Sequence, residues 1–188
     1  NWSAVNTGLS HVAVTSIIAS GSNLFAGTYG GGVFRSTNNG ANWAEANTSL
    51  THKTINSLGF DISGSILAGT YGAGVFRTTN NGTVWSNIST GISDISVKKL
   101  AVSGSNLFAG TDGSGVFRST NNGANWSAVN AGLTSNYVYG LLVSGTNIFA
   151  GTYSAGVFRS TNNGANWVAV NSGITAASIS SFAVSGSA

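Results

Sequence analysis

The 188-residue sequence contains no cysteine, methionine or proline, and only 6% of its residues are charged. Without cysteine, the chain can form no disulfide and no thiolate metal site, and it has no thiol nucleophile. The charged fraction is far below the roughly 25% of an ordinary soluble domain, so Asn, Ser, Thr and Gly must supply the polar surface. Seven Lys and Arg residues are too few for the basic face of a nucleic-acid-binding protein, so we expect no nucleic-acid partner.

Long hydrophobic runs are also missing. No apolar stretch approaches the roughly 18 residues of a membrane-spanning helix, so we expect no membrane insertion. We expect no signal peptide among these residues. A hydrophobic content of 41% argues against disorder and is sufficient for a buried core.

The sequence is dominated by an internal repeat of about 41 residues, marked by tryptophan. The spacings of the five tryptophans are 41, 42, 41 and 41 residues, at Trp2, Trp43, Trp85, Trp126 and Trp167. A repeat that covers nearly the whole chain predicts one domain, 1–188, built of similar units. The repeats are 1–41, 42–83, 84–124 and 125–165, with a partial repeat at 166–188.

Each unit is predicted to contain four short strands. In the first unit, β-branched and apolar residues separated by Gly, Ser and Asn turns predict strands at 12–19, 23–28, 33–37 and 42–47. Four strands joined by such turns form an antiparallel meander, and four-stranded units of about 40 to 45 residues are typical of β-propeller blades. We therefore expect an all-β propeller with four complete blades plus two terminal strands, at 1–6 and 178–185.

The length does not match a whole number of repeats. Five units would need about 205 residues at this period, and the sequence has 188 with no methionine at its start. We expect a piece of a longer propeller. The alternative is that the open strand edges are completed by another copy, because unpaired edges associate readily.

A polar block precedes each of the last four tryptophans. In the first complete repeat it reads Ser-Thr-Asn-Asn-Gly-Ala-Asn-Trp, over residues 36–43. This block resembles the Asp-box, or BNR, repeat, S/T-x-D-x-G-x-x-W, with Asn in the Asp position. The resemblance implies a secreted bacterial β-propeller and a structural role for the box. The matching residues are Ser36, Asn38, Gly40, Trp43, Thr78, Asn80, Gly82, Trp85, Ser119, Asn121, Gly123, Trp126, Ser160, Asn162, Gly164 and Trp167.

The chemistry of the block also favours a structural role. A short polar side chain can accept hydrogen bonds from backbone N–H groups of its own turn, and Gly accepts positive φ. An arginine precedes each block, at Arg35, Arg77, Arg118 and Arg159. Since acids are scarce, we expect these arginines to stack on nearby tryptophans instead of forming ion pairs.

Variable residues are expected on one face of the propeller. The loops between the second and third strands and the connections between blades share that face, and they differ between repeats. Variation on a constant scaffold is how loops acquire specificity, and aromatic rings with neutral polar groups suit carbohydrate or protein ligands. The candidate ligand-binding residues are Tyr29, Tyr71, Asp112, Tyr153, His11, His52, Asp94 and Tyr137.

These observations predict a non-enzymatic extracellular or cell-surface module, used for adhesion, for glycan or protein binding, or as a scaffold. One alternative is a glycosidase of the sialidase or xyloglucanase class, for which Asp94 and Asp112 are the one plausible carboxylate pair. Another is a self-assembling fibre or coat subunit. We expect no catalytic residue, no cofactor and no metal. A metal site at His11, His52 and Asp94 is the disfavoured reading, because loop histidines are seldom ligands without further support.

Overall fold

The computed structural model describes residues 1–175 and 178–185, and this part of the chain contains sixteen β-strands and no helix. It therefore holds no helix that is long and apolar enough to cross a membrane. The strands form four antiparallel sheets of four strands each, hydrogen-bonded in chain order. The predicted all-β propeller architecture is confirmed, and each sheet is one blade.

The four blades repeat the same strand pattern. Blade 1 consists of β1 (Val14–Ser20), β2 (Asn23–Thr28), β3 (Gly32–Ser36) and β4 (Ala44–Glu45). Blade 2 consists of β5 (Ile55–Phe60), β6 (Ile66–Thr70), β7 (Val75–Thr78) and β8 (Ser86–Asn87). Blade 3 consists of β9 (Val97–Ser103), β10 (Asn106–Thr111), β11 (Val116–Ser119) and β12 (Ser127–Ala128). Blade 4 consists of β13 (Val138–Ser144), β14 (Asn147–Thr152), β15 (Val157–Ser160) and β16 (Val168–Ala169).

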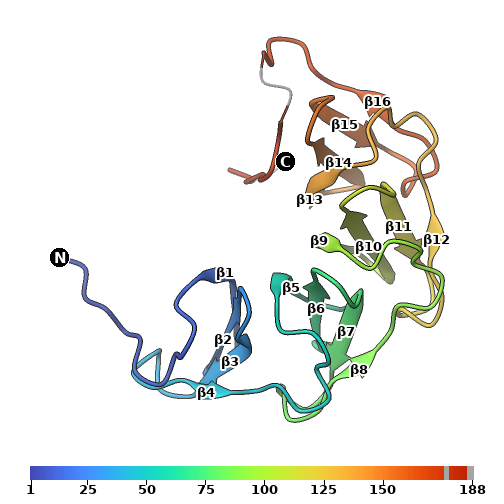
Figure 1. The fold of residues 1–188 in the computed structure, drawn as a ribbon. Coiled ribbons are helices and arrows are strands. Elements are labelled where there is room, and N and C mark those ends of the chain that lie inside the picture. Colours follow the sequence, from blue (N-terminus) through green and yellow to red (C-terminus); the bar gives the residue numbers. More distant parts are fainter. Residues whose placement is uncertain (176–177, 186–188) are drawn as a thin grey trace.

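The blades follow one another along an open arc (Figure 1). The first strand of each blade lies on the inner side of the arc, and the short fourth strand lies on the outer side. The third and fourth strands are joined by the box turns, which lie at the same end of the blade as the turns between the first two strands. The variable loops lie at the opposite end, which we call the loop face.

The hydrophobic core is divided among the contacts between blades. In the cluster between blades 2 and 3, Leu67 and Val75 of blade 2 pack with Leu100, Leu107 and Trp126 of blade 3. Corresponding clusters lie between blades 1 and 2 and between blades 3 and 4. Because a blade is covered on both faces, successive residues of its central strands are buried, and each large side chain buried there contributes roughly 1.5–3 kcal/mol.

The fourth strands are shorter than the sequence predicts. The predicted strand 42–47 contains only the two-residue β4. Asn42 and Trp43 do not pair with β3, since the Asn42 N–H donates to the Asn38 side chain and the Trp43 N–H donates to the Thr7 carbonyl. Asn42 and Trp43 were predicted to belong to the fourth strand. They are instead hydrogen-bonded to the box turn and to the segment that precedes β1.

The two predicted terminal strands are absent from the described residues: neither 1–6 nor 178–185 contains a strand. Within the described residues, neither segment forms a ladder of hydrogen bonds with a strand. They nevertheless take equivalent places, because the Val5 carbonyl accepts the Trp43 indole N–H and the Ile179 N–H donates to the Thr152 carbonyl. The two segments thus lie where the sequence predicts, but neither is a β-strand.

Every first strand carries a β-bulge near its start. In β9 the pairing with β10 skips from Val97 to Lys99, and in β13 the pairing with β14 skips from Val138 to Gly140. The unpaired residues are therefore Lys98 and Tyr139. The same irregularity occurs in β1 and β5. A bulge bends a strand and redirects a side chain, so one residue per blade leaves the regular alternation at this position.

Candidate ligand-binding site on the loop face

The loop face is built where the loop of each blade meets the connection that leads into the same blade. Backbone N–H groups of the loop residues Tyr71, Asp112 and Tyr153 donate to carbonyl groups of these connections. The acceptors are Thr54, Ser96 and Tyr137, at distances of 3.0 Å in each case. These bonds hold the predicted variable loops and connections together on one face.

The four predicted loop positions Tyr29, Tyr71, Asp112 and Tyr153 are equivalent in the four blades. The three tyrosines are more than half exposed, so their rings are not packed away inside their own loops. Tyr137, in the connection before blade 4, is also exposed. Exposed tyrosine rings combine a flat apolar surface with a polar tip, which suits contact with a ligand.

An ion pair lies among these tyrosines. The Lys98 ammonium lies 2.9 Å from a carboxylate oxygen of Asp112, and about a quarter of each side chain is exposed, 23% and 24%. The Lys98 ammonium also lies 5.0 Å from the centre of the Tyr71 ring and 5.5 Å from that of Tyr139. Cation–π attraction at such distances adds to the ion pair and fixes the lysine between two rings.

Tyr139 completes this arrangement. Its hydroxyl donates to the other Asp112 carboxylate oxygen at 2.8 Å, and its ring lies 5.6 Å from the Tyr153 ring at an angle of 54°. The hydrogen bond to the Asp112 carboxylate, together with burial, raises the pKa of Tyr139 to about 12. The hydroxyl therefore remains a donor at any physiological pH. We call Tyr71, Lys98, Asp112, Tyr139 and Tyr153 the tyrosine–lysine cluster.

Lys98 and Tyr139 are the cluster residues that the sequence reasoning missed. They are the bulge residues of β9 and β13, and the equivalent residues of the first two blades are Thr15 and Asn56. In those blades the bulge side chains bond to backbone: Thr15 to the Gly27 carbonyl and Asn56 to that of Val97. Alignment of the repeats would have revealed the signal, since this position changes from Thr to Asn, Lys and Tyr.

The predicted residues His11, His52 and Asp94 do not join the cluster as a group. They are equivalent in successive blades, and each lies against a glycine of its own blade's loop, Gly31, Gly72 and Gly113 respectively. The Asp94 carboxylate accepts the Ser96 N–H at 3.0 Å. Among the described residues, no three His or acidic side chains converge as metal ligands.

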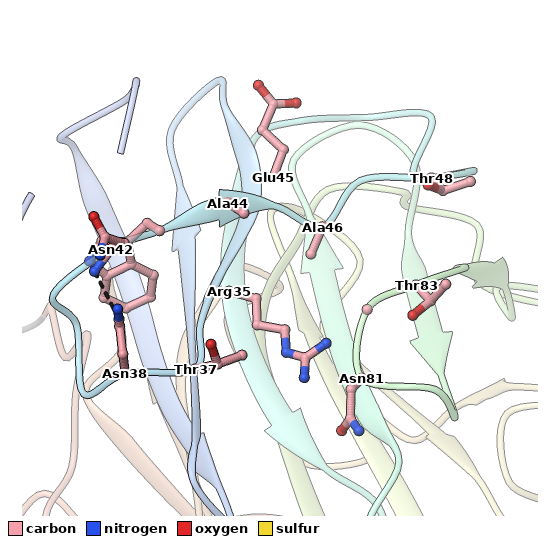
Figure 2. A pocket seen from close by; sticks show the side chains of 12 residues that line it. Arg35, Thr37, Asn38, Asn42, Ala44, Glu45, Ala46, Thr48, Asn81 and Thr83 are labelled. Atoms are coloured by element: carbon pink, nitrogen blue, oxygen red, sulfur yellow. Dashed lines mark hydrogen bonds between the residues drawn. The ribbon is translucent and has the colours of Figure 1, made fainter. Parts of the chain in front are cut away.

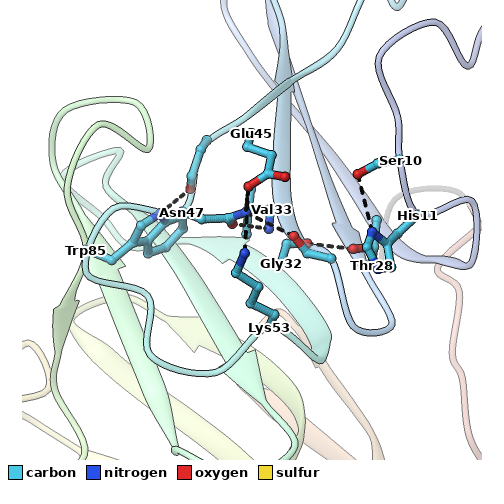
Figure 3. A network of polar contacts seen from close by, with 11 residues as sticks. Ser10, His11, Thr28, Gly32, Val33, Glu45, Asn47, Lys53 and Trp85 are labelled. Carbon is cyan, nitrogen blue, oxygen red and sulfur yellow. Dashed lines mark hydrogen bonds and ion pairs between the residues drawn. The ribbon is translucent and has the colours of Figure 1, made fainter.

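Near blades 1 and 2 the loop face is occupied by a framework of polar contacts (Figure 3). Asn47 accepts the Val33 N–H at 2.7 Å and donates to the Gly31 carbonyl. Glu45 contacts Asn47 and also pairs with Lys53 at 3.7 Å, in a pair that is about half exposed. These residues hold the connection against the loop of blade 1, and their polar groups are largely used in these contacts instead of being available to a ligand.

The sixteen box residues lie at the opposite end of the blades. In the third box turn, the Asn121 side-chain oxygen accepts the Asn125 N–H at 2.9 Å, and Ser119 accepts the Gly123 N–H at 2.8 Å. The other three turns repeat both bonds. Each box tryptophan donates its indole N–H to a carbonyl of the preceding repeat, at Val5, Ala46, Ile88 or Val129. Asparagine thus supplies the hydrogen-bond acceptor for the backbone N–H of the turn without introducing a charge.

The arginines do not stack on tryptophan as expected, since the cation–π contacts in the described residues involve only Lys98. Arg77 and Arg118 instead donate to the carbonyls of Asn122 and Asn163 in the next box turn. Arg35 donates to Asn23 and points into an open cavity of about 460 Å³ that also includes Asn81 (Figure 2). Arg77 and Arg118 bond to backbone because a carbonyl of the neighbouring box turn lies within reach of each guanidinium.

The carboxylates all have local partners. Asp112 is held by Lys98 and Tyr139, and Asp94 accepts a backbone N–H. Asp61 lies in the turn between β5 and β6. Burial raises the pKa of Asp61, but hydrogen bonds from Ser63 and Ser65 outweigh burial, and the pKa lies below its usual value.

Comparison with solved structures places this arc within known propellers. The extracellular domain of a protein assigned as the hybrid two-component system BT3049 from B. thetaiotaomicron has a TM-score of 0.74 at 19% identity, over 92% of this chain and 24% of that one. A GH74 xyloglucanase from Xanthomonas campestris has a TM-score of 0.66 at 19% identity, over 89% of this chain and 31% of that one. YCF48 bound to D1 peptide has a TM-score of 0.66 at 15% identity, over 86% of this chain and 56% of that one.

These likenesses establish the fold. The chain spans only about a quarter of the length of the extracellular domain. No curated protein sequence matches the chain. The family model described as the DUF6242 beta propeller domain matches residues 66–186, which is more than half of the sequence. The chain therefore belongs to the DUF6242 beta-propeller domain family.

Proposed function

We propose that this chain is a non-enzymatic binding module of an extracellular or cell-surface protein, and that its ligand site is the tyrosine–lysine cluster. The observation that carries the proposal is the gathering of three tyrosine rings around the Lys98–Asp112 pair. Blade 1 offers nothing comparable, although its scaffold is the same. A specialised set of side chains on a repeated scaffold is typical of a binding surface.

The charge balance of the cluster favours a neutral ligand. Lys98 and Asp112 neutralise each other, and each is three-quarters buried. What remains accessible is ring surface, hydroxyl groups and loop backbone. A sugar ring presents an apolar C–H face together with hydroxyls, so a carbohydrate fits this chemistry, and an uncharged protein segment is the second candidate.

The extracellular assignment and the Asp-box resemblance belong to the same proposal. Two observations support them: the similar structures include an extracellular domain, and all four box turns use the same side-chain bonds. The low charge and the absence of cysteine agree with secreted bacterial repeat proteins. Asp94 and Asp112 are engaged by partners within the protein: Asp94 by a backbone N–H, and Asp112 by Lys98 and Tyr139. A glycosidase needs one free carboxyl group as an acid and a second as a base or nucleophile, so these contacts support binding without catalysis.

A glycan array probed with the purified chain tests this proposal, accompanied by a hydrolysis assay on xyloglucan and sialosides. We expect the chain to retain a subset of glycans and to release no sugar. Hydrolysis that is lost in Asp94→Asn or Asp112→Asn would support the glycosidase alternative instead. Retention of no glycan, with capture of a defined protein segment, would move the assignment to the protein ligand.

A further inference from the structure

The contact between blades 1 and 2 differs from the next two contacts at one position. The residue directly after the fourth strand is Ala46 in blade 1, Ile88 in blade 2 and Val129 in blade 3. The carbonyl of each accepts the indole N–H of the next box tryptophan, so the three positions are equivalent. The Ile88 and Val129 side chains pack close to Gly123 and Gly164 of the next box turn. Alanine therefore leaves space that a branched side chain fills at the other two contacts.

The cavity of about 460 Å³ into which Arg35 points lies at this position and includes Ala46 in its lining. It is bordered by β3, β4 and the box turn of blade 2 (Figure 2). Its volume falls within the range of small-molecule sites, roughly 300–1,000 Å³. Thr37, Thr48 and Asn81 contribute hydroxyl and amide groups to its lining. The cavity can therefore hold a small molecule and offer hydrogen bonds to it.

Arg35 is oriented differently from the equivalent arginines of blades 2 and 3. Arg77 and Arg118 donate from Nη1 to a carbonyl of the next box turn, at 3.2 and 2.8 Å. Arg35 instead donates from Nε and Nη2 to the Asn23 side-chain oxygen, at 3.1 and 2.9 Å. Asn106 occupies the place of Asn23 in blade 3, yet Arg118 bonds to the next turn. The neighbouring asparagine alone therefore does not dictate the orientation of Arg35.

One edge of the Arg35 guanidinium is held and the opposite edge is free. The edge formed by Nε and Nη2 bonds to Asn23. The edge formed by Nη1 and Nη2 carries two parallel N–H groups, and Nη1 makes no hydrogen bond to any described residue. Such a fork matches the two oxygens of a carboxylate. Because Asn23 already fixes the plane of the guanidinium, less side-chain entropy is lost when a ligand binds.

The local charge favours an anion in this cavity. Glu45 is the one acidic side chain among the described residues that line it. Its carboxylate is engaged elsewhere, by Asn47 at 3.1 Å and by Lys53 at 3.7 Å. Figure 2 shows Glu45 and Arg35 extending to opposite sides of β4. A carboxylate bound to Arg35 therefore gains the attraction of the guanidinium without lying beside Glu45.

We propose that this cavity is a second ligand site, which binds a small carboxylate that also carries hydroxyl groups, as a uronic acid does. The carboxylate accepts both N–H groups of the free Arg35 edge, and the hydroxyls bond to the threonine and asparagine side chains of the lining. The site lies beside the box turns, whereas the tyrosine–lysine cluster lies on the loop face. The two sites therefore differ in place and in the charge of their ligands.

A nuclear magnetic resonance titration of the ¹⁵N-labelled chain with glucuronate tests this proposal. We expect glucuronate to shift the Arg35 Nε–H signal and the backbone amide signals of residues 36–46 and 81–83. The amide signals of Tyr71 and Lys98 should stay unchanged, because they belong to the loop face. Shifts confined to the loop face would assign glucuronate to the tyrosine–lysine cluster and overturn the second site.

Glucose and inorganic phosphate are the comparison probes. Glucose should leave the signals of residues 36–46 unchanged, because it has the hydroxyls but lacks the carboxylate. Phosphate should bind at least about tenfold more weakly than glucuronate, because it lacks the hydroxyl-bearing ring that contacts the rest of the lining. Equal affinity for phosphate, or equal affinity for glucose, would overturn the assignment to a hydroxylated carboxylate.

Two variants separate the cavity from its cation. Ala46→Val introduces the branched side chain of the other contacts, and Arg35→Lys keeps the charge but removes the planar fork. Each should lower the affinity for glucuronate at least about tenfold. Arg77→Lys is the matched control and should bind as the native chain does, because Arg77 is bonded to the next turn. Circular dichroism verifies that each variant is folded. Unchanged affinity in a folded Ala46→Val or Arg35→Lys variant, or no shifts in the native chain, would overturn the proposal.

Discussion

Lys98 and Asp112 connect the loop-face residues of blades 2 to 4. Asp112 replaces a tyrosine of the other three repeats, and its carboxylate joins β9 to β13 through Lys98 and Tyr139. The pair lies partly out of water, where an unpaired charge would be costly. Its partners are therefore expected to matter for stability as well as for the shape of the site.

Lys98→Met should reduce the free energy of unfolding by about 1–2 kcal/mol, because it leaves the largely buried Asp112 carboxylate with one charged partner fewer. Urea denaturation of the purified chain measures this change. Lys53→Met is the matched control, since the Lys53–Glu45 pair is about half exposed and should contribute at most about 0.5 kcal/mol. Equal losses in the two variants would show that the Lys98 pair has no special role.

The raised pKa of Tyr139 predicts a loss of folding stability at alkaline pH. The pKa of Tyr139 rises from 10.0 to about 12 on folding, so the folded state keeps a proton that the unfolded state loses. The contribution is complete below pH 10 and is lost as the pH rises through the folded pKa. Chemical denaturation between pH 10 and pH 12 should therefore show that the free energy of unfolding falls more steeply with rising pH in the native chain than in Tyr139→Phe. Tyr137→Phe, which changes an exposed tyrosine, should leave the steeper loss in place.

At the scale of elements, the box turn explains how four short strands make a stable blade. The turn satisfies its own backbone through Ser or Thr and Asn, and its tryptophan bonds to the preceding repeat. Local turn geometry and the contact between blades are therefore coupled in one segment. This coupling accounts for the near-identity of the block in every repeat.

Asn121→Ala should lower the free energy of unfolding by about 1 kcal/mol, because the Asn125 N–H loses its acceptor. Asn121→Asp keeps an acceptor oxygen and should cost less. The melting temperatures of the two variants provide the comparison. If the aspartate variant were as destabilised as the alanine variant, the acceptor would not be what the turn requires.

Gly91 tests the contact between neighbouring repeats. It has a φ of 94°, and a Cβ at this position would overlap the Trp126 carbonyl oxygen. Gly104 also has a positive φ, 55°, but a Cβ there would meet open space. Gly104→Ala should therefore cost about 1–2 kcal/mol of backbone strain, and Gly91→Ala at least about 3 kcal/mol in equilibrium unfolding. Equal costs would remove the steric argument.

At the scale of the whole molecule, the repeat made the architecture predictable. The period, the turn residues and the apolar strands are local signals, and they were sufficient for four blades and for the two faces of the propeller. The prediction of terminal strands failed, because a strand needs a ladder of hydrogen bonds with a neighbour, and residues 1–6 and 178–185 form no such ladder in the described structure. Sequence pattern gives the position of such a segment but not its partner.

The candidate site was predictable only in part, for a related reason. Tyr71, Asp112 and Tyr153 were indicated by their differences from repeat to repeat in an exposed loop. Lys98 and Tyr139 lie inside strands, and only a β-bulge brings them to the loop face. A bulge depends on hydrogen-bond register between strands, which the alternation of residues in a single strand does not reveal.

The most direct test of the proposed binding role is a glycan array with three proteins: the native chain, Tyr71→Ala/Tyr153→Ala, and Ile62→Ser. Ile62 is exposed on the opposite face, so the third protein controls for the loss of a surface side chain. We predict that the native chain and Ile62→Ser retain the same glycans, and that the double variant loses at least about tenfold in affinity for them, equivalent to roughly 1.4 kcal/mol. Equal retention by all three proteins, or retention of no glycan by the native chain, would contradict a carbohydrate site at the tyrosine–lysine cluster.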